Sequence, residues 1–184
     1  TRRPHPGYDK PIPAADMIQF SLTSHRGCAG GCSFCSLALH QGRQIRSRSA
    51  HSLRKEVERL TEHPDWTGSI TDVGGPSSNM WGARCAKRTE AGSKAFACGR
   101  ASCLAPERCP HFKDEQAELA RLLKTLAAVP GVKHLRVASG IRHDLALNEP
   151  GYVKTLLRDF VGGQLKLAPE HCCEGVLALM RKPS

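Results

Sequence analysis

The chain has 184 residues, a hydrophobic content of 40 % and a formal net charge of +10. These values suit one globular domain that can bury roughly two thirds of its unfolded surface. No apolar run approaches the ~20 residues of a membrane span, and the N-terminus lacks a signal peptide's apolar region, so we expect no membrane partner and a cytoplasmic location.

The chain contains nine cysteines, and most of them are clustered. In a reducing cytoplasm such spacings favour metal or cluster ligation over disulfides. The positive charge is concentrated in residues 43–55 and 84–100. This charge would attract nucleic acid or anionic substrates. The aromatic content of 5 % leaves few stacking surfaces, however, so a solvated basic surface is the favoured interpretation.

Hydrophobic periodicity divides the chain into a lead-in and an alternating series of strands and helices. The four prolines of residues 1–13 predict an extended lead-in, and residues 14–184 form the core. We expect strands at 17–23, 69–73, 134–138 and 164–168, and helices at 50–63, 115–129, 152–160 and 176–180. Strands that alternate with helices predict an α/β fold with an open parallel sheet, because a closed barrel needs more units than these four.

The first cysteine group (Cys28, Cys32 and Cys35) follows the first expected strand with the spacing C-x3-C-x2-C. The interleaved glycines let backbone amides approach a bound anion, and a cubic iron–sulfur cluster prefers thiolate ligands. Three cysteines leave one iron of a four-iron cluster without a protein ligand, which suits catalysis. The alternatives are a zinc loop that borrows His25 or His40, and three merely buried thiols.

The second cysteine group lies in residues 77–113, an insertion without periodicity. So long an irregular segment needs its own cross-link, and four thiolates satisfy either tetrahedral zinc or a closed cluster. The intervals of twelve, four and five residues contain no tight C-x2-C pair, so an iron–sulfur cluster is slightly preferred to zinc. Buried or loosely paired thiols are the third alternative. The members of this group are Cys85, Cys98, Cys103 and Cys109.

The C-x3-C-x2-C spacing, with Phe34 before the last cysteine, resembles the signature loop of the radical SAM enzymes. The wider sequence resembles the YgiQ-type family of these enzymes from about residue 10 to residue 184. The segments that carry this resemblance are 24–28, 35–42, 72–81, 103–109, 139–142 and 165–171.

The resemblance implies a partial parallel (β/α) barrel, here incomplete, with residues 77–113 as a cysteine-rich insertion. It also implies a [4Fe–4S] cluster on Cys28, Cys32 and Cys35. The open iron would chelate S-adenosylmethionine, and reductive cleavage would give a 5′-deoxyadenosyl radical that abstracts hydrogen from a substrate the sequence does not name. The electron would come from a reductant such as flavodoxin or ferredoxin.

Further site residues follow from the resemblance, since active sites gather at the carboxyl ends of parallel strands. Phe34 would approach the adenine, and Gly74 and Gly75 would approach the methionine amine. Arg142 would pair with the methionine carboxylate, and Glu170 or His171 would reach the ribose. Pro76 stands where many radical SAM enzymes carry a glutamate, and its side chain cannot accept the hydrogen bond that a glutamate would accept from the amine.

A function of another class also fits the composition. In it, the chain is a non-catalytic module that binds nucleic acid through its arginines and is stabilised by zinc or a cluster at the second cysteine group. Colour separates the two hypotheses, because an iron–sulfur protein is brown and bleaches with dithionite, whereas a zinc protein is colourless.

Overall fold

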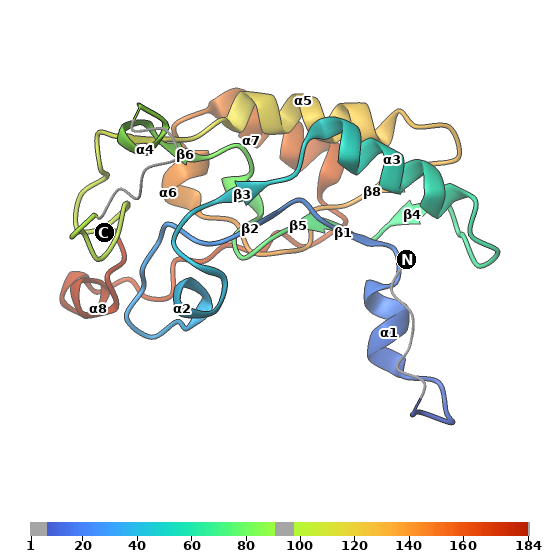
Figure 1. The fold of residues 1–184 in the computed structure, drawn as a ribbon, viewed down its shortest axis with the longest axis horizontal. Coiled ribbons are helices and arrows are strands. Elements are labelled where there is room, and N and C mark those ends of the chain that lie inside the picture. The colour runs from blue at the N-terminus through green and yellow to red at the C-terminus, as the bar shows by residue number, and fades with distance from the viewer. Residues whose placement is uncertain (1–6, 91–97, 184) are drawn as a thin grey trace.

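The structure of the chain is a computed structural model that describes residues 7–90 and 98–183 (Figure 1). The helices are α1 (Pro13–Ile18), α2 (Leu37–Gln41), α3 (Ala50–Thr61), α4 (Ala86–Glu90), α5 (Gln116–Ala127), α6 (His143–Ala146), α7 (Pro150–Thr155) and α8 (Glu174–Met180), with a 3-10 turn η1 (Ser78–Met80) and a π-helical turn η2 (Leu156–Phe160). The strands are β1 (Ser21–Thr23), β2 (His25–Arg26), β3 (Arg46–Ser47), β4 (Ser69–Ile70), β5 (Asp72–Gly74), β6 (Arg84–Cys85), β7 (Phe112–Lys113) and β8 (His134–Leu135).

Short parallel strand pairs form the centre of the fold. β1 pairs with β5, with Leu22 opposite Val73, and β4 pairs with β8, with Ile70 opposite Leu135. Because β4 and β5 follow each other along the chain, they lie between β1 and β8. The pairs β2–β3 and β6–β7 are antiparallel. The described residues form a mixed α/β fold without a closed barrel.

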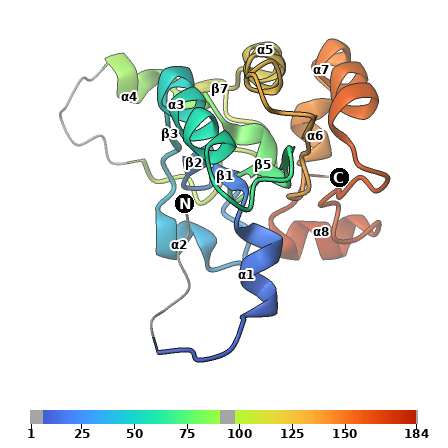
Figure 2. The same ribbon diagram turned by 90° about the vertical axis from the view of Figure 1, so that its right-hand side faces the viewer.

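Helices cover the two sides of these strands unequally. α3, α5 and α7 form one layer, whereas α1, α2 and α8 lie on the opposite side (Figures 1 and 2). The layer of longer helices packs its apolar side chains onto the strands, and each fully buried leucine contributes about 1.5–3 kcal/mol. The core includes Leu22, Leu53, Val57, Leu60, Ile70, Val73, Leu119, Leu123, Leu126, Leu135 and Val137.

The predicted helices are confirmed, and their ends have local causes. α3 begins at Ser49, whose hydroxyl accepts from the Ser52 N–H at 3.2 Å, and it ends shortly before Pro64. α5 lies within residues 115–129, and α7 continues into η2 to cover the helix expected at 152–160. α8 contains the helix expected from residue 176 onward.

The strand predictions are less accurate. Residues 17 and 18 belong to α1 instead of a strand, because Pro13 occupies the first turn of that helix, where its missing N–H costs nothing. The lead-in predicted over residues 1–13 therefore ends one residue early, because Pro13 already belongs to α1. Residues 69–73 form two strands separated at Thr71, and β8 is shorter than expected.

The prediction of a fourth strand at residues 164–168 is wrong. Only one parallel bridge forms there, between Ile141 and Leu167. The backbone that it would pair with turns into α6 at His143, two residues beyond the bridge, so the ladder cannot continue. Leu167 is accordingly half-exposed.

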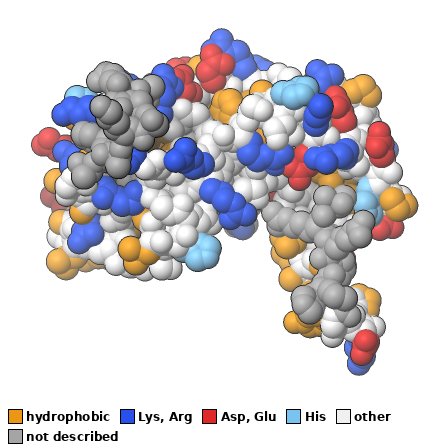
Figure 3. All heavy atoms as spheres, viewed as in Figure 1, with side chains coloured by type: hydrophobic (Ala, Val, Ile, Leu, Met, Phe, Trp, Pro, Cys, Tyr) orange, Lys and Arg blue, Asp and Glu red, His pale blue; other side chains and the backbone are white. Residues whose placement is uncertain are grey.

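The insertion, residues 77–113, contains only short elements in the parts that the structure describes. Its ends are joined by the β6–β7 pair, in which Arg84 lies opposite Lys113. Residues 91–97 lie outside the described residues. Lys and Arg side chains are spread over one face of the molecule, with uncharged surface between them (Figure 3).

Candidate functional site

The first cysteine group lies on a loop, residues 27–36, between β2 and α2 (Figure 1). The Cys28 N–H donates to the Gly42 carbonyl at 3.1 Å, which closes the base of the loop. Gly27 has φ +87°, and a Cβ there would lie 1.9 Å from the Gln44 carbonyl oxygen. A side chain at residue 27 is therefore excluded, and the loop leaves the strand end in one fixed direction.

The three thiols of this group are free, partly exposed and close together. Gly30 lies between two of them: a Cβ there would be 3.4 Å from Cys28 Sγ and 3.5 Å from Cys32 Sγ. Burial raises the pKa of Cys28, the Gly30 N–H opposes this, and the thiols of Cys32 and Cys35 raise it further. Throughout residues 7–90 and 98–183, no three Cys, His, Asp or Glu side chains are gathered as a single metal ion requires.

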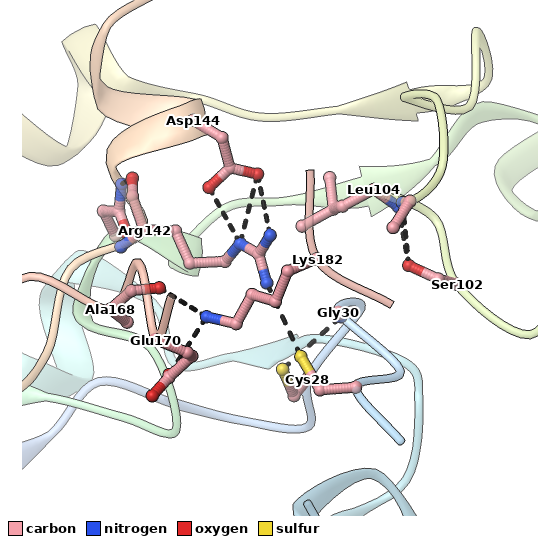
Figure 4. Close-up of polar contacts among 12 residues, drawn as sticks. Cys28, Gly30, Ser102, Leu104, Arg142, Asp144, Ala168, Glu170 and Lys182 are labelled. Atoms are coloured by element: carbon pink, nitrogen blue, oxygen red, sulfur yellow. Dashed lines mark hydrogen bonds and ion pairs between the residues drawn. The ribbon is translucent and has the colours of Figure 1, made fainter. Parts of the chain in front are cut away.

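A buried arginine stands beside these thiols (Figure 4). Arg142 Nε and Nη2 donate to the Asp144 carboxylate at 2.9 and 2.8 Å, and Arg142 Nη1 faces Cys32 Sγ at 3.9 Å. Asn79 holds the backbone of Arg142 through two hydrogen bonds, at 2.9 and 3.0 Å. Burial alone would lower the pKa of Arg142, but the hydrogen bonds and the charge of Asp144 raise it, so a fixed positive charge faces the loop.

The C-terminal part of the chain supports the loop from the other side. The Ser33 hydroxyl donates to the Leu179 carbonyl at 2.6 Å, at the end of α8. Lys182 is almost fully buried and donates to the Ala168 carbonyl and to Glu170 Oε1 (Figure 4). Glu170 is therefore paired with a buried lysine although its own side chain is 36 % exposed, and the exposed His171 accepts a backbone N–H at 2.9 Å.

A cavity of about 870 Å³, the strand-end cavity, lies at the carboxyl ends of β1 and β5. Gly74 and Gly75 line it, as do Met17 and Ile18 of α1. It also reaches both flanks of the cysteine loop. Its further lining residues are Ser21, Leu22, Thr23, His25, Arg26, Leu37, Gln41, Thr71, Asp72, Pro76, Ala138, Ser139, Gly140 and Lys166.

The two glycines of this cavity are packed too tightly to carry a side chain. A Cβ at Gly74 would lie 2.5 Å from Ser139 Oγ, and one at Gly75 would lie 2.5 Å from the His25 ring. His25 is buried, with Nδ1 2.9 Å from Ser24 Oγ. Burial lowers the pKa of His25 to about 4, although the nearby Ser77 backbone opposes this, so the ring is neutral at pH 7.

The predicted site residues thus fall into two neighbouring groups. Gly74 and Gly75 line the strand-end cavity, whereas Arg142 lies beside the thiols and Glu170 pairs with Lys182. Phe34 is half-exposed, and it does not line the cavity. Sequence reasoning missed Asp72, Asn79, Asp144, Lys166 and Lys182. One feature of the sequence could have identified Asp144: it is an acidic residue two positions after Arg142, which is close enough for an ion pair.

The segment that contains the second cysteine group contacts the loop of the first group. The Cys103 N–H donates to the Ala29 carbonyl at 3.0 Å, and the Cys109 N–H donates to the Cys103 carbonyl at 2.8 Å. Gly31 has φ +60°, and a Cβ there would be 2.1 Å from the Ala101 carbonyl oxygen. The cysteine loop and the insertion therefore fit together backbone to backbone.

A second cavity of about 470 Å³, the arginine-lined cavity, opens at this group. Cys85, Cys98 and Cys103 line it, while Cys109 is buried. Burial raises the pKa of Cys103, Arg43 lowers it, and the three other cysteines raise it, so each of these three thiols lies near that of Cys103. The other lining residues are Ala29, Arg43, Gln44, Ile45, Arg46, Arg84, Arg88 and Phe112.

In the part of the chain that the structure describes, no helix has the length and apolar character needed to cross a bilayer. No protein-family model matches the chain.

The chain is similar to curated proteins that carry the family name UPF0313. The chain is 46 % identical over 184 residues to one from Methanocella arvoryzae, which covers 100 % of the chain and 30 % of that protein. It is 46 % identical over 183 residues to one from Methanosarcina acetivorans, and the match covers 100 % of the chain and 24 % of that protein. It is 48 % identical over 185 residues to one from Yersinia pestis, and the match covers 99 % of the chain and 23 % of that protein.

The chain therefore spans less than a third of the length of these relatives. The names of these relatives state a family and no reaction. Over its whole length, the chain is a sequence of the UPF0313 (YgiQ-type) family that corresponds to one segment of those longer proteins.

Proposed function

We propose that the chain is the cluster-binding part of a radical SAM enzyme. One observation carries this proposal: three free cysteines lie on one loop, two of them on either side of Gly30, and the two flanks of that loop border a large cavity at the strand ends. In parallel α/β folds this edge of the sheet is where substrates bind. The loop and the cavity together provide a place for a metal cluster and, next to it, a place for a small molecule.

The donor set suits a [4Fe–4S] cluster. Its donors are thiols alone, the soft ligands that iron–sulfur clusters use. They are not gathered as one ion requires, but they interact electrostatically with one another, which fits a cluster of several metal atoms. Arg142 adds a buried positive charge 3.9 Å from Cys32 Sγ, which favours a net anionic group.

A cluster held by Cys28, Cys32 and Cys35 would supply the electron that breaks a carbon–sulfur bond of S-adenosylmethionine, which gives methionine and a 5′-deoxyadenosyl radical. The chain's own residues bind and orient the small molecule. Gly74 and Gly75 present backbone to the cavity, and Lys166 lines it with a positive charge. Met17 and Ile18 of α1 border the cavity with exposed apolar side chains. The roles that the family resemblance implies for Arg142, Phe34 and Glu170 stay predictions, since none of the three lines the strand-end cavity.

The fold supports the same function. The parallel pairs β1–β5 and β4–β8 and the bridge from Ile141 to Leu167 follow one another as strands do at the start of a (β/α) barrel. We infer that the remainder of the longer protein completes this partial barrel and contributes the substrate pocket. A cytoplasmic reductant such as flavodoxin or ferredoxin then supplies the electron.

The test is anaerobic reconstitution of the full-length protein with iron and sulfide, followed by S-adenosylmethionine, dithionite and an assay for 5′-deoxyadenosine. The wild type should be brown and form this product, and Cys32→Ala should not form it. The matched control is Cys172→Ala/Cys173→Ala, because both residues are exposed cysteines outside the loop. Product from Cys32→Ala, or a colourless wild type that binds zinc, would overturn the proposal.

A further inference from the structure

The arginine-lined cavity is the second place in the described residues where cysteines converge. Cys85 comes from β6, Cys98 and Cys103 come from the irregular chain that follows residue 97, and all three line the same cavity. Cys109 is buried beside Cys103, which it contacts through a 2.8 Å backbone hydrogen bond. Three thiols therefore line one cavity and the fourth is buried next to it, and none of the four forms a disulfide.

The size of this space discriminates between the candidate occupants. Tetrahedral zinc requires its sulfurs about 2.3 Å from one ion, with no room between them. Here the thiols border a cavity of about 470 Å³, and none of the described Cys, His, Asp or Glu side chains form a trio suited to one ion. A group that contains several metal atoms and bridging sulfides fills such a space, and a [4Fe–4S] cluster uses four cysteines.

The charge of the cavity points the same way. Among the residues that the structure describes, its lining contains four arginines, Arg43, Arg46, Arg84 and Arg88, and no acidic side chain. Arg43 is close enough to Cys103 to interact with it electrostatically. Because a cluster with four thiolates is an anion, this lining would stabilise it.

We propose that Cys85, Cys98, Cys103 and Cys109 ligate a second iron–sulfur cluster in the arginine-lined cavity. This centre is separate from the one on Cys28, Cys32 and Cys35, and its ligation does not depend on radical SAM chemistry. Its ligand segment is joined to the first loop by the hydrogen bond from Cys103 to Ala29.

The experiment uses the full-length protein, reconstituted anaerobically with ferrous iron and sulfide, and counts iron, acid-labile sulfide and zinc per chain. The starting variant carries Cys28→Ala, Cys32→Ala and Cys35→Ala, so that the first site is absent. Adding Cys98→Ser and Cys103→Ser to it should remove about four further irons and as many sulfides. Adding Cys172→Ser and Cys173→Ser instead, which changes two exposed cysteines, should remove none.

The proposal is overturned if the starting variant and its Cys98→Ser/Cys103→Ser derivative bind equal iron. It is also overturned if the starting variant binds one zinc and no sulfide. Because Cys98 is exposed, Cys98→Ser alone should fold, and it too should lower the iron content; an unchanged content overturns the proposal. Failure of the first site has a different signature: the wild type and the starting variant would then bind equal iron.

Discussion

The two cysteine groups lie back to back, but the chain supports them differently. The first group is on a short glycine-rich loop held by buried charges: the side chains of Arg142 and Lys182 are each 4 % exposed. The second group is collected from a long irregular segment, and Arg84, beside it, is 51 % exposed in its side chain. Buried ion pairs are expensive to break, whereas exposed ones contribute little. The first site is therefore preorganised by the fold, and the second depends on what its own thiols bind.

The strongest test of this comparison removes the buried cation of the first group. Arg142→Met leaves the Asp144 carboxylate, 16 % exposed, without its partner. We expect a loss of about 3–5 kcal/mol in the free energy of unfolding, because an uncompensated charge stays buried. Chemical denaturation monitored by circular dichroism measures it. The double variant Arg142→Met/Asp144→Leu should recover most of the loss, and equal destabilisation of both variants would contradict the explanation.

The contact between the two groups gives the next largest effect. Gly31→Ala places a Cβ 2.1 Å from the Ala101 carbonyl oxygen at a φ of +60°, so the backbones must separate. We expect a loss of about 3 kcal/mol in stability, from strain and lost packing. The matched control is Gly175→Ala, since Gly175 lies in α8 with nothing within 4 Å and the change favours the helix. Thermal melting of both variants tests this, and a Gly31→Ala protein as stable as the control would refute the backbone contact.

The accuracy with which the sequence predicts structure differs between the helices and the strands. α3 and α5 are predictable within about two residues, because their buried leucines recur at helical spacing and the Ser49 cap is local. The strand expected at 164–168 fails because pairing depends on a distant segment, which turns into α6 instead. Local alternation of apolar and polar residues does not contain that information.

The same distinction applies to the site. The cysteine loop and the Gly74–Gly75 turn can be identified from short motifs, because their residues are adjacent in the sequence. Lys182 cannot, because its burial depends on the Ala168 carbonyl and on Glu170, which are brought to it by the loop before α8. The contact between Ala29 and Cys103 is also long-range, so the sequence predicts the two cysteine groups without indicating that they touch.

Acid should destabilise the fold around the first cysteine group through His25, which begins the strand β2 that leads into the loop. Burial lowers the pKa of His25 to about 4 from an ordinary value of 6.5, so the folded state disfavours the proton. Stability is therefore complete above pH 6.5 and is lost as pH falls toward 4, by roughly 3 kcal/mol at most. Denaturation of apoprotein across this range, compared with His25→Gln, measures the effect. The variant should show a flatter pH dependence, and parallel curves would exclude His25 as the cause.

The smallest effect is expected at the second group, where the ion pair is exposed. Arg84 pairs with Glu115 across the β6–β7 end of the insertion, but water screens both side chains. Arg84→Met should therefore change the free energy of unfolding by less than about 1 kcal/mol, and the small change should vanish at high salt. Arg142→Met should keep its large effect at the same salt concentration, because its pair is shielded from ions. If the two variants respond alike to salt, then the two cysteine groups are supported in the same way and the contrast between them is wrong.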